Sequence, residues 1–114
     1  VYQENIYDPE GKPFKSVKRI LHEMGSEYSE AVELISFHST SKGLIGECGR
    51  RGGYFECHGL DPLVMEQVFK VASISLCSNV MGQIMVSLML DPPRKGDPSH
   101  SLYEEERNFI LGIK

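Results

Sequence analysis

The stretch that decides the fold is Val32-Glu33-Leu34-Ile35-Ser36-Phe37-His38-Ser39-Thr40-Ser41-Lys42-Gly43. Its apolar first half, residues 32–37, predicts a β-strand. Its polar second half follows the strand directly and ends on a lysine and a glycine. Further glycines then recur as far as Gly53, where they allow the backbone to approach a ligand closely. A strand that feeds hydroxyl groups and an amine into a glycine-rich loop indicates a binding loop.

The residue types in this loop suit a phosphorylated cofactor that is held covalently. Ser39 lies three residues before Lys42, and Arg50-Arg51 follows within the same glycine-rich segment. A lysine amine can form an imine with a carbonyl group. A serine hydroxyl and an arginine fork can bind a phosphate. We therefore predict that Lys42 bonds the cofactor and that Ser39 and one of the two arginines hold its phosphate.

The rest of the chain predicts helices around two or three strands. Residues 1–7 alternate loosely and are typical of a strand end, and residues 53–57 predict a further short strand. Apolar residues at helical spacing predict a helix over 15–24. Leu60-Asp61-Pro62 predicts a helix start with Asp61 as its cap, and this apolar, buried helix runs to about Ser75.

After an interruption at Ser78-Asn79, a second apolar helix is expected over residues 80–90. Ser101-x-x-Glu104 is a capping box, which predicts a last helix through Lys114. Strands that alternate with helices indicate an α/β layer structure. The length of 114 residues suits one domain with a core of ordinary size.

The composition excludes several classes of function. The net charge is −4 and no basic run occurs, which argues against a nucleic-acid surface. No apolar run approaches the roughly 18 residues of a membrane span. The 3 cysteines lack paired spacing, which favours a reducing compartment, and the 4 histidines lack metal-ligand spacing. We expect a cytoplasmic protein with no metal, with the mitochondrion and the peroxisome left open.

The loop also resembles a known family. Ser39-Thr40-Ser41-Lys42-Gly43-x-x-Gly46-Glu47-Cys48-Gly49-x-Arg51-Gly52-Gly53-Tyr54 is similar to the lysine region of class I pyridoxal-phosphate-dependent aminotransferases. It looks most like the alanine aminotransferase subgroup, and the similarity covers essentially all of the chain. The stretches Leu76-Cys77-Ser78-Asn79-x-x-Gly82-Gln83 and Asp91-Pro92-Pro93 fit the same subgroup. The resemblance implies an α/β fold in which residues 1–114 form part of the large, pyridoxal-phosphate-binding domain of the fold type I transferases.

The resemblance also implies a role for each site residue. Lys42 would carry pyridoxal 5'-phosphate as a Schiff base and then shuttle a proton. Ser39 and Arg51 would bind the phosphate, with Arg51 preferred over Arg50 because the family's arginine directly precedes Gly-Gly. Tyr2 would donate a hydrogen bond to the phenolic oxygen of the cofactor. The reaction would move an amino group between alanine and 2-oxoglutarate in a homodimer whose ligands are small amino and 2-oxo acids.

The same resemblance implies that the site is incomplete here. The family's partners of the pyridine nitrogen and of the substrate carboxylate would lie before Val1 and beyond Lys114. We therefore expect an internal piece, incomplete at both ends, that is inactive alone.

Three alternative functions stay open at this point. The first is a glutamate:glyoxylate aminotransferase, and the second is a non-catalytic piece that keeps only the fold. The third is an acyl-transfer enzyme with a Ser39-x-x-Lys42 nucleophile motif. The Ser-Asp-Asn and Lys-Thr-Gly elements that accompany this motif are missing from the sequence, which disfavours the third alternative.

Overall fold

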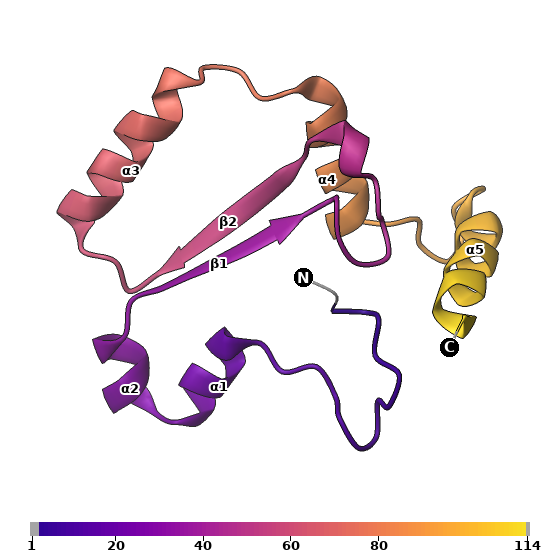
Figure 1. Ribbon diagram of the computed structural model, residues 1–114, viewed down its shortest axis with the longest axis horizontal. Helices are drawn as coiled ribbons and strands as arrows, with labels where there is room; N and C mark the ends of the chain where they lie inside the picture. The colour runs from indigo at the N-terminus through magenta and orange to yellow at the C-terminus, as the bar shows by residue number, and fades with distance from the viewer. Residues whose placement is uncertain (1–2, 114) are drawn as a thin grey trace. The chain divides into compact units, whose positions relative to one another are not determined.

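The computed structural model describes residues 3–113 and divides the chain into two compact units. We call Lys15–Phe37 with Tyr54–Ser78 the hairpin unit, and Val1–Phe14 with His38–Gly53 and Asn79–Lys114 the loop unit. Figure 1 shows the order of the elements along the chain. The chain combines helices with a small sheet, so the expected α/β class is confirmed as a mixture of helix and strand.

The sheet is a two-stranded hairpin of β1 (Leu34–Ser39) and β2 (Gly53–His58). The two arrows point in opposite directions in Figure 1, so the strands are antiparallel. The strands predicted over residues 32–37 and 53–57 are confirmed, although β1 begins two residues later than residue 32. The loop between them, residues 40–52, contains the lysine region and one short 3-10 helix, η1 (Cys48–Arg50). The hairpin therefore presents this loop at one end.

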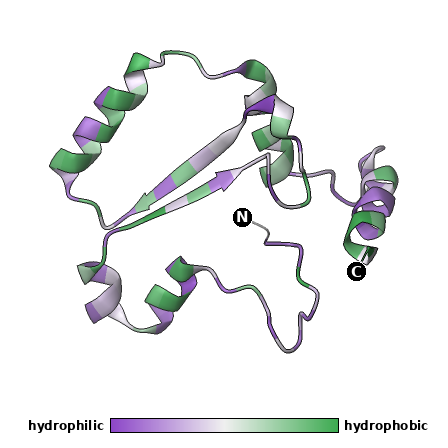
Figure 2. Ribbon diagram, in the orientation of Figure 1, coloured by the Kyte–Doolittle hydropathy of each residue, from purple (hydrophilic) through white to green (hydrophobic). Residues whose placement is uncertain are grey.

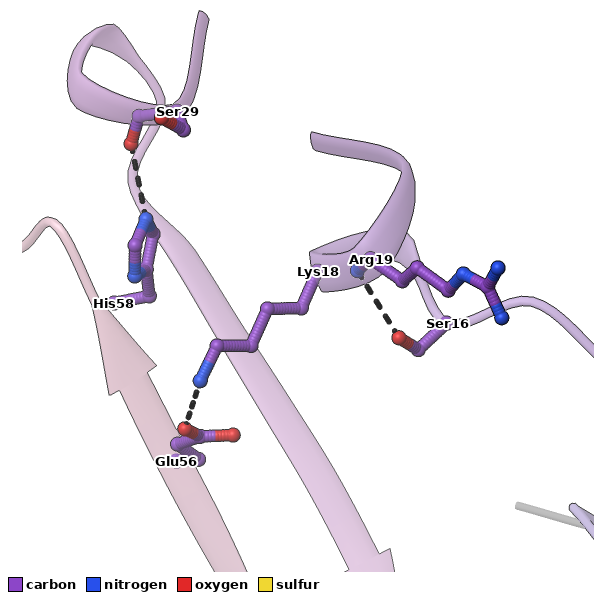
Figure 3. A network of polar contacts seen from close by, with 6 residues as sticks. All are labelled: Ser16, Lys18, Arg19, Ser29, Glu56 and His58. Atoms are coloured by element: carbon purple, nitrogen blue, oxygen red, sulfur yellow. Dashed lines mark hydrogen bonds and ion pairs between the residues drawn. The ribbon is translucent and has the colours of Figure 1, made fainter. Parts of the chain in front are cut away.

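Two short helices of the hairpin unit are attached to β2 by polar contacts (Figure 3). In α1 (Val17–Glu23), Lys18 forms an ion pair with Glu56, and this hydrogen bond holds the pKa of the Glu56 carboxyl below its usual range. In α2 (Ser26–Ala31), the carbonyl of Ser29 lies 2.9 Å from His58 Nε2. The helix predicted over 15–24 is confirmed as α1. The sequence did not predict α2, because it lacks apolar residues at helical spacing.

The helix α3 (Pro62–Ile74) begins as predicted. Asp61 Oδ1 accepts a hydrogen bond from the N–H of Leu63 at 2.7 Å, and Pro62 occupies the first turn. The expectation that this helix is buried is wrong in this structure, since Phe69 is 67% exposed and Ile74 78% exposed. An apolar helix is buried only where another layer covers it. Figure 2 shows hydrophobic residues along α3, and several of these are exposed.

The loop unit contains α4 (Val80–Leu90) and α5 (His100–Gly112). The prediction of a helix over 80–90 is confirmed. The predicted capping box at Ser101 is wrong, because α5 begins at His100 and its N-cap, Ser99, makes no side-chain hydrogen bond there. The strand end predicted for residues 1–7 is also wrong over residues 3–7, which contain no strand. Residues 1–2 lie outside the described part of the chain.

The core is much smaller than the length of the chain suggested. Within residues 3–113, Leu21 is the one buried large apolar residue, and Thr40 is the buried polar one. The expectation of a core of ordinary size is therefore wrong for the part of the chain that the structure describes. Its helices are also too short or too polar for any of them to cross a lipid bilayer.

Candidate functional site

Lys42 lies in the turn directly after β1, and its side chain is exposed. Its backbone N–H donates a hydrogen bond to the carbonyl of Ser39 at 3.3 Å, which forms the turn. Among residues 3–113, no carboxylate forms an ion pair with its amine. The Lys42 amine is therefore available to a ligand.

The loop is closed at its base by Thr40 and Gly52. Thr40 is 0% exposed, and both its N–H and its hydroxyl donate hydrogen bonds of 3.1 Å to the carbonyl of Gly52. The Ser39 hydroxyl donates a longer bond, of 3.4 Å, to the same oxygen. The carbonyl of Thr40 accepts a hydrogen bond from the N–H of Glu47 at 2.8 Å. These contacts bring Ser39 and Arg51, which are distant in sequence, to the same end of the hairpin.

Ser39, Ser41 and Arg51 form a linked group that we call the hydroxyl–arginine cluster. The N–H of Ser41 donates to Ser39 Oγ at 3.1 Å, and Arg51 Nη1 donates to Ser41 Oγ at 3.4 Å. Arg51 Nη1 also donates to the carbonyl of Cys48 at 2.8 Å. The structure therefore brings together two of the residues predicted to bind phosphate and adds Ser41, which the sequence did not single out.

The two neighbouring arginines have different surroundings. Arg50 Nε lies 3.8 Å from a carboxylate oxygen of Glu47, so the side chain of Arg50 is directed toward an acidic partner. Arg51 is instead directed toward Ser41 and the carbonyl of Cys48. An anion is attracted less to an arginine whose charge is already paired. This difference favours Arg51 over Arg50 as a phosphate ligand.

The N-terminus of α4 packs against the loop at very close range. A Cβ atom on Gly52 would lie 2.5 Å from the carbonyl oxygen of Gly82, and one on Gly82 would lie 2.9 Å from the carbonyl oxygen of Arg51. Asn79, the N-cap of α4, donates a hydrogen bond from Nδ2 to the carbonyl of Arg50 at 2.8 Å. Sequence reasoning missed these contacts, although an asparagine directly before an apolar helix is itself a capping signal.

His38 lies beside the cluster at the end of β1 and is partly buried. Burial lowers the pKa of its imidazole below the usual range. The unfolded chain then accepts a proton more readily than the folded chain does, so this residue reduces the free energy of unfolding as the pH falls below about 6.5. Tyr2, the remaining predicted site residue, lies outside the described residues.

A cavity of about 320 Å³ lies within the loop unit, between the loop and helices α4 and α5. Leu44, Ile45, Met85 and Ile110 contribute to its apolar lining. Ser39, Lys42 and Arg51 do not line it. The candidate site is therefore an exposed loop surface and not this cavity. No group of three or more metal-ligating side chains occurs among residues 3–113.

Comparison with known proteins finds aminotransferases that are similar to nearly the whole chain. It is 52% identical over 110 residues to a probable mitochondrial alanine aminotransferase of Dictyostelium discoideum, a match that covers 96% of this chain and 20% of the relative. It is 53% identical over 111 residues to glutamate–glyoxylate aminotransferase 1 of Arabidopsis thaliana, covering 97% of this chain and 23% of the relative. For alanine aminotransferase 2 of Xenopus tropicalis the identity is 49% over 112 residues, with coverages of 98% and 21%.

About half of the residues are identical in alignments that cover nearly the whole chain, so the chain is a homologue of these aminotransferases. More narrowly, it is homologous to the alanine and glutamate–glyoxylate aminotransferases, which confirms the resemblance found in the sequence. The chain spans about a fifth of the length of these relatives. No protein-family model matches the chain.

The buried Thr40 hydroxyl generates the first prediction. The variant Thr40→Val loses the hydrogen bond from the hydroxyl to the carbonyl of Gly52 and keeps the one from the N–H. The net contribution of one hydrogen bond to the free energy of unfolding is about 1 kcal/mol. We expect the N–H of Glu47, which donates to the carbonyl of Thr40, to exchange its hydrogen about fivefold faster, as measured by hydrogen–deuterium exchange. Thr40→Ser keeps the hydroxyl and should leave this rate nearly unchanged. Equal rates in the two variants would contradict the role of the bond.

The contact between Gly52 and Gly82 generates the second prediction. Alanine normally stabilises a helix interior by about 1 kcal/mol relative to glycine. In Gly82→Ala the new methyl group would meet the carbonyl of Arg51, so we expect the free energy of unfolding to fall by about 1–3 kcal/mol instead. Urea unfolding of the protein that carries this sequence measures the change. Gly112→Ala in α5 is the matched control, because a Cβ there meets nothing within 4 Å, and it should not destabilise.

Proposed function

We propose that the protein carrying this sequence is a pyridoxal-phosphate-dependent aminotransferase that moves an amino group between alanine and 2-oxoglutarate. In this proposal, residues 1–114 are part of the large domain of a fold type I transferase and contribute one wall of its site. The single observation that carries the proposal is the hydroxyl–arginine cluster beside an available lysine amine. The homology to named aminotransferases supports the same reaction class.

The chemistry of the cluster fits a phosphate group. Ser39 and Ser41 supply hydroxyl groups, and Arg51 supplies a planar fork of N–H donors that matches phosphate oxygens. Arg51 donates through Nη1 to Cys48 and Ser41, whereas its Nε and Nη2 donate to no other described residue. These N–H groups of Arg51 would therefore bind the phosphate together with the Ser39 hydroxyl.

Lys42 would hold the cofactor covalently through Nζ and would act as the proton carrier. Bound pyridoxal phosphate supplies a conjugated ring that accepts electrons from the substrate. Once the amino group of the substrate has replaced Lys42 on the cofactor, the freed Nζ would take a proton from the α-carbon of the amino acid and deliver it to the cofactor. A base acts in this way only within hydrogen-bond reach of the proton. The short turn between Ser39 and Lys42 would keep the amine close to the residues that hold the phosphate.

The remaining parts of the proposal concern residues and partners beyond the described site. Tyr2 would donate a hydrogen bond to the phenolic oxygen of the cofactor. The ligands would be small amino and 2-oxo acids, and the working protein would be a homodimer. The compartment is proposed to be the cytoplasm. The relative from Dictyostelium discoideum is a probable mitochondrial enzyme, which favours the mitochondrion as the second choice.

A second candidate function is transfer between glutamate and glyoxylate. The relative with that name from Arabidopsis thaliana is as similar to this chain as the alanine enzymes are. Assays of the purified protein with alanine plus 2-oxoglutarate and with glutamate plus glyoxylate would separate the two reactions. Binding of pyridoxal phosphate with neither activity would favour the non-catalytic alternative.

Replacement of Lys42 tests the catalytic assignment. We expect Lys42→Ala to lower transamination at least about a thousandfold, because general base catalysis commonly contributes two to four orders of magnitude. Borohydride reduction followed by peptide mapping should fix the cofactor to Lys42 in the unmodified protein and not in the variant. Lys95→Ala, at another exposed lysine, is the matched control and should retain activity and the adduct. Activity of Lys42→Ala at the control level would refute the mechanism.

The two arginines provide a further test. Arg51→Ala should weaken binding of pyridoxal phosphate by one to two orders of magnitude, because charge-assisted bonds contribute about 1.5–3 kcal/mol. Arg50→Ala removes the same charge from the same loop and should have a much smaller effect, since Arg50 faces Glu47. Equilibrium titration, followed by absorbance, measures both. If the two variants lose affinity equally, the assignment of the phosphate to Arg51 is wrong.

A further inference from the structure

Asn79 uses both ends of its side-chain amide. Its Oδ1 accepts a hydrogen bond from the N–H of Met81 at 3.1 Å and caps α4. Its Nδ2 donates a hydrogen bond to the carbonyl of Arg50 at 2.8 Å. A serine or an aspartate could replace the first bond, but neither offers an amide donor for the second. The helix and the loop are therefore joined by a residue whose two functions are separable by mutation.

The backbone that Asn79 contacts has a costly conformation. Arg51 has φ 53° and ψ 48°, in the left-handed region that residues other than glycine rarely adopt. Such a conformation persists only where the surrounding structure enforces it. The preceding carbonyl, of Arg50, is bonded by Asn79, and the following carbonyl, of Gly52, is bonded by Thr40. The peptide before Arg51 and the peptide after Gly52 are thus held by side chains outside the segment 47–52.

The carbonyl of Arg51 itself faces α4. A Cβ on Gly82 would come within 2.9 Å of it, so the helix backbone and the loop are in direct contact. Because Asn79 caps the same helix three residues earlier, its bond to Arg50 keeps the helix end at this distance from the loop. The direction of the Arg51 side chain follows from φ and ψ at that residue, and so does its reach to Ser41 Oγ.

We propose that Asn79 is a positioning residue for the phosphate site: its amide bond to the carbonyl of Arg50 holds Arg51 in the left-handed conformation that directs its guanidinium toward the hydroxyl–arginine cluster. This role rests on the proposed function of Arg51. Asn79 does not contact the anion in this account and acts only through Arg51.

Asn79→Ser separates the two bonds of Asn79. Serine keeps a neutral cap for the N–H of Met81 but removes the donor to Arg50. We expect the dissociation constant for pyridoxal phosphate to rise about fivefold, as befits one hydrogen bond. The constant for pyridoxal, which lacks the phosphate, should stay the same. An equal loss for both ligands would show a general structural effect and would overturn the proposal.

A double-mutant cycle tests the route of the effect. In the Arg51→Ala background, Asn79→Ser should not weaken pyridoxal phosphate binding further, because residues that act through one another are not additive. A full fivefold loss in that background would overturn the proposal.

A measurement without cofactor keeps the positioning role testable even if the protein binds no pyridoxal phosphate. The N–H of Arg50 donates to the carbonyl of Glu47 within the loop. Asn79→Ser should speed hydrogen exchange of this N–H severalfold, whereas exchange in α3, which belongs to the hairpin unit, should stay unchanged. Unchanged exchange at Arg50 would refute the positioning role. Failure of the unmodified protein to prefer pyridoxal phosphate over pyridoxal, with faster exchange in the variant, would refute only the proposed phosphate site.

Discussion

The carbonyl oxygen of Gly52 is the atom on which the candidate site depends. It accepts hydrogen bonds from the N–H and the hydroxyl of Thr40, both at 3.1 Å, and Thr40 is 0% exposed. A buried hydroxyl without a partner would be costly, so this bond fixes the rotamer of Thr40 as well as the peptide that follows Gly52. Because this contact closes the loop, Ser39 and Arg51 lie at the same end of the hairpin.

A closed loop alone would not hold an arginine in a left-handed conformation. Glycine at position 51 would adopt the same backbone without strain, but it could not supply a guanidinium group. The structure instead keeps the arginine and holds the backbone before and after it. Asn79 bonds the carbonyl of Arg50, and Thr40 bonds the carbonyl of Gly52. Local strain next to a predicted ligand site is often found where the surrounding contacts over-determine the backbone. The site therefore depends on α4 as much as on the hairpin.

Parts of the fold could be predicted from the sequence, and the helices that were predicted correctly share a cause. Asp61-Pro62 and the apolar run of residues 80–90 specify their helices through contacts within a few residues, and the structure confirms both. The bond between Asn79 and Arg50 joins residues 29 apart, and sequence periodicity contains no information about such a contact. The capping box predicted at Ser101 failed for a different reason. The local pattern is present in the sequence, but α5 begins at His100, so Ser101 lies inside the helix and cannot cap it. Ser39 and Arg51 were predicted from their spacing, three residues before Lys42 and directly before Gly52-Gly53, whereas Ser41 and Thr40 resembled ordinary turn residues.

The order of the three residues Arg51-Gly52-Gly53 follows from these contacts. A side chain at position 52 would meet the carbonyl of Gly82 at 2.5 Å, and one at position 53 would meet the carbonyl of His38 at 2.7 Å. Both obstacles are backbone atoms, which cannot move aside as a flexible side chain can. Position 51 is the one of the three whose side chain has space, although its backbone is the strained one. An arginine at either other position would separate α4 or β1 from the loop. The segment can therefore supply a guanidinium to the cluster only in this order, at the cost of one left-handed residue.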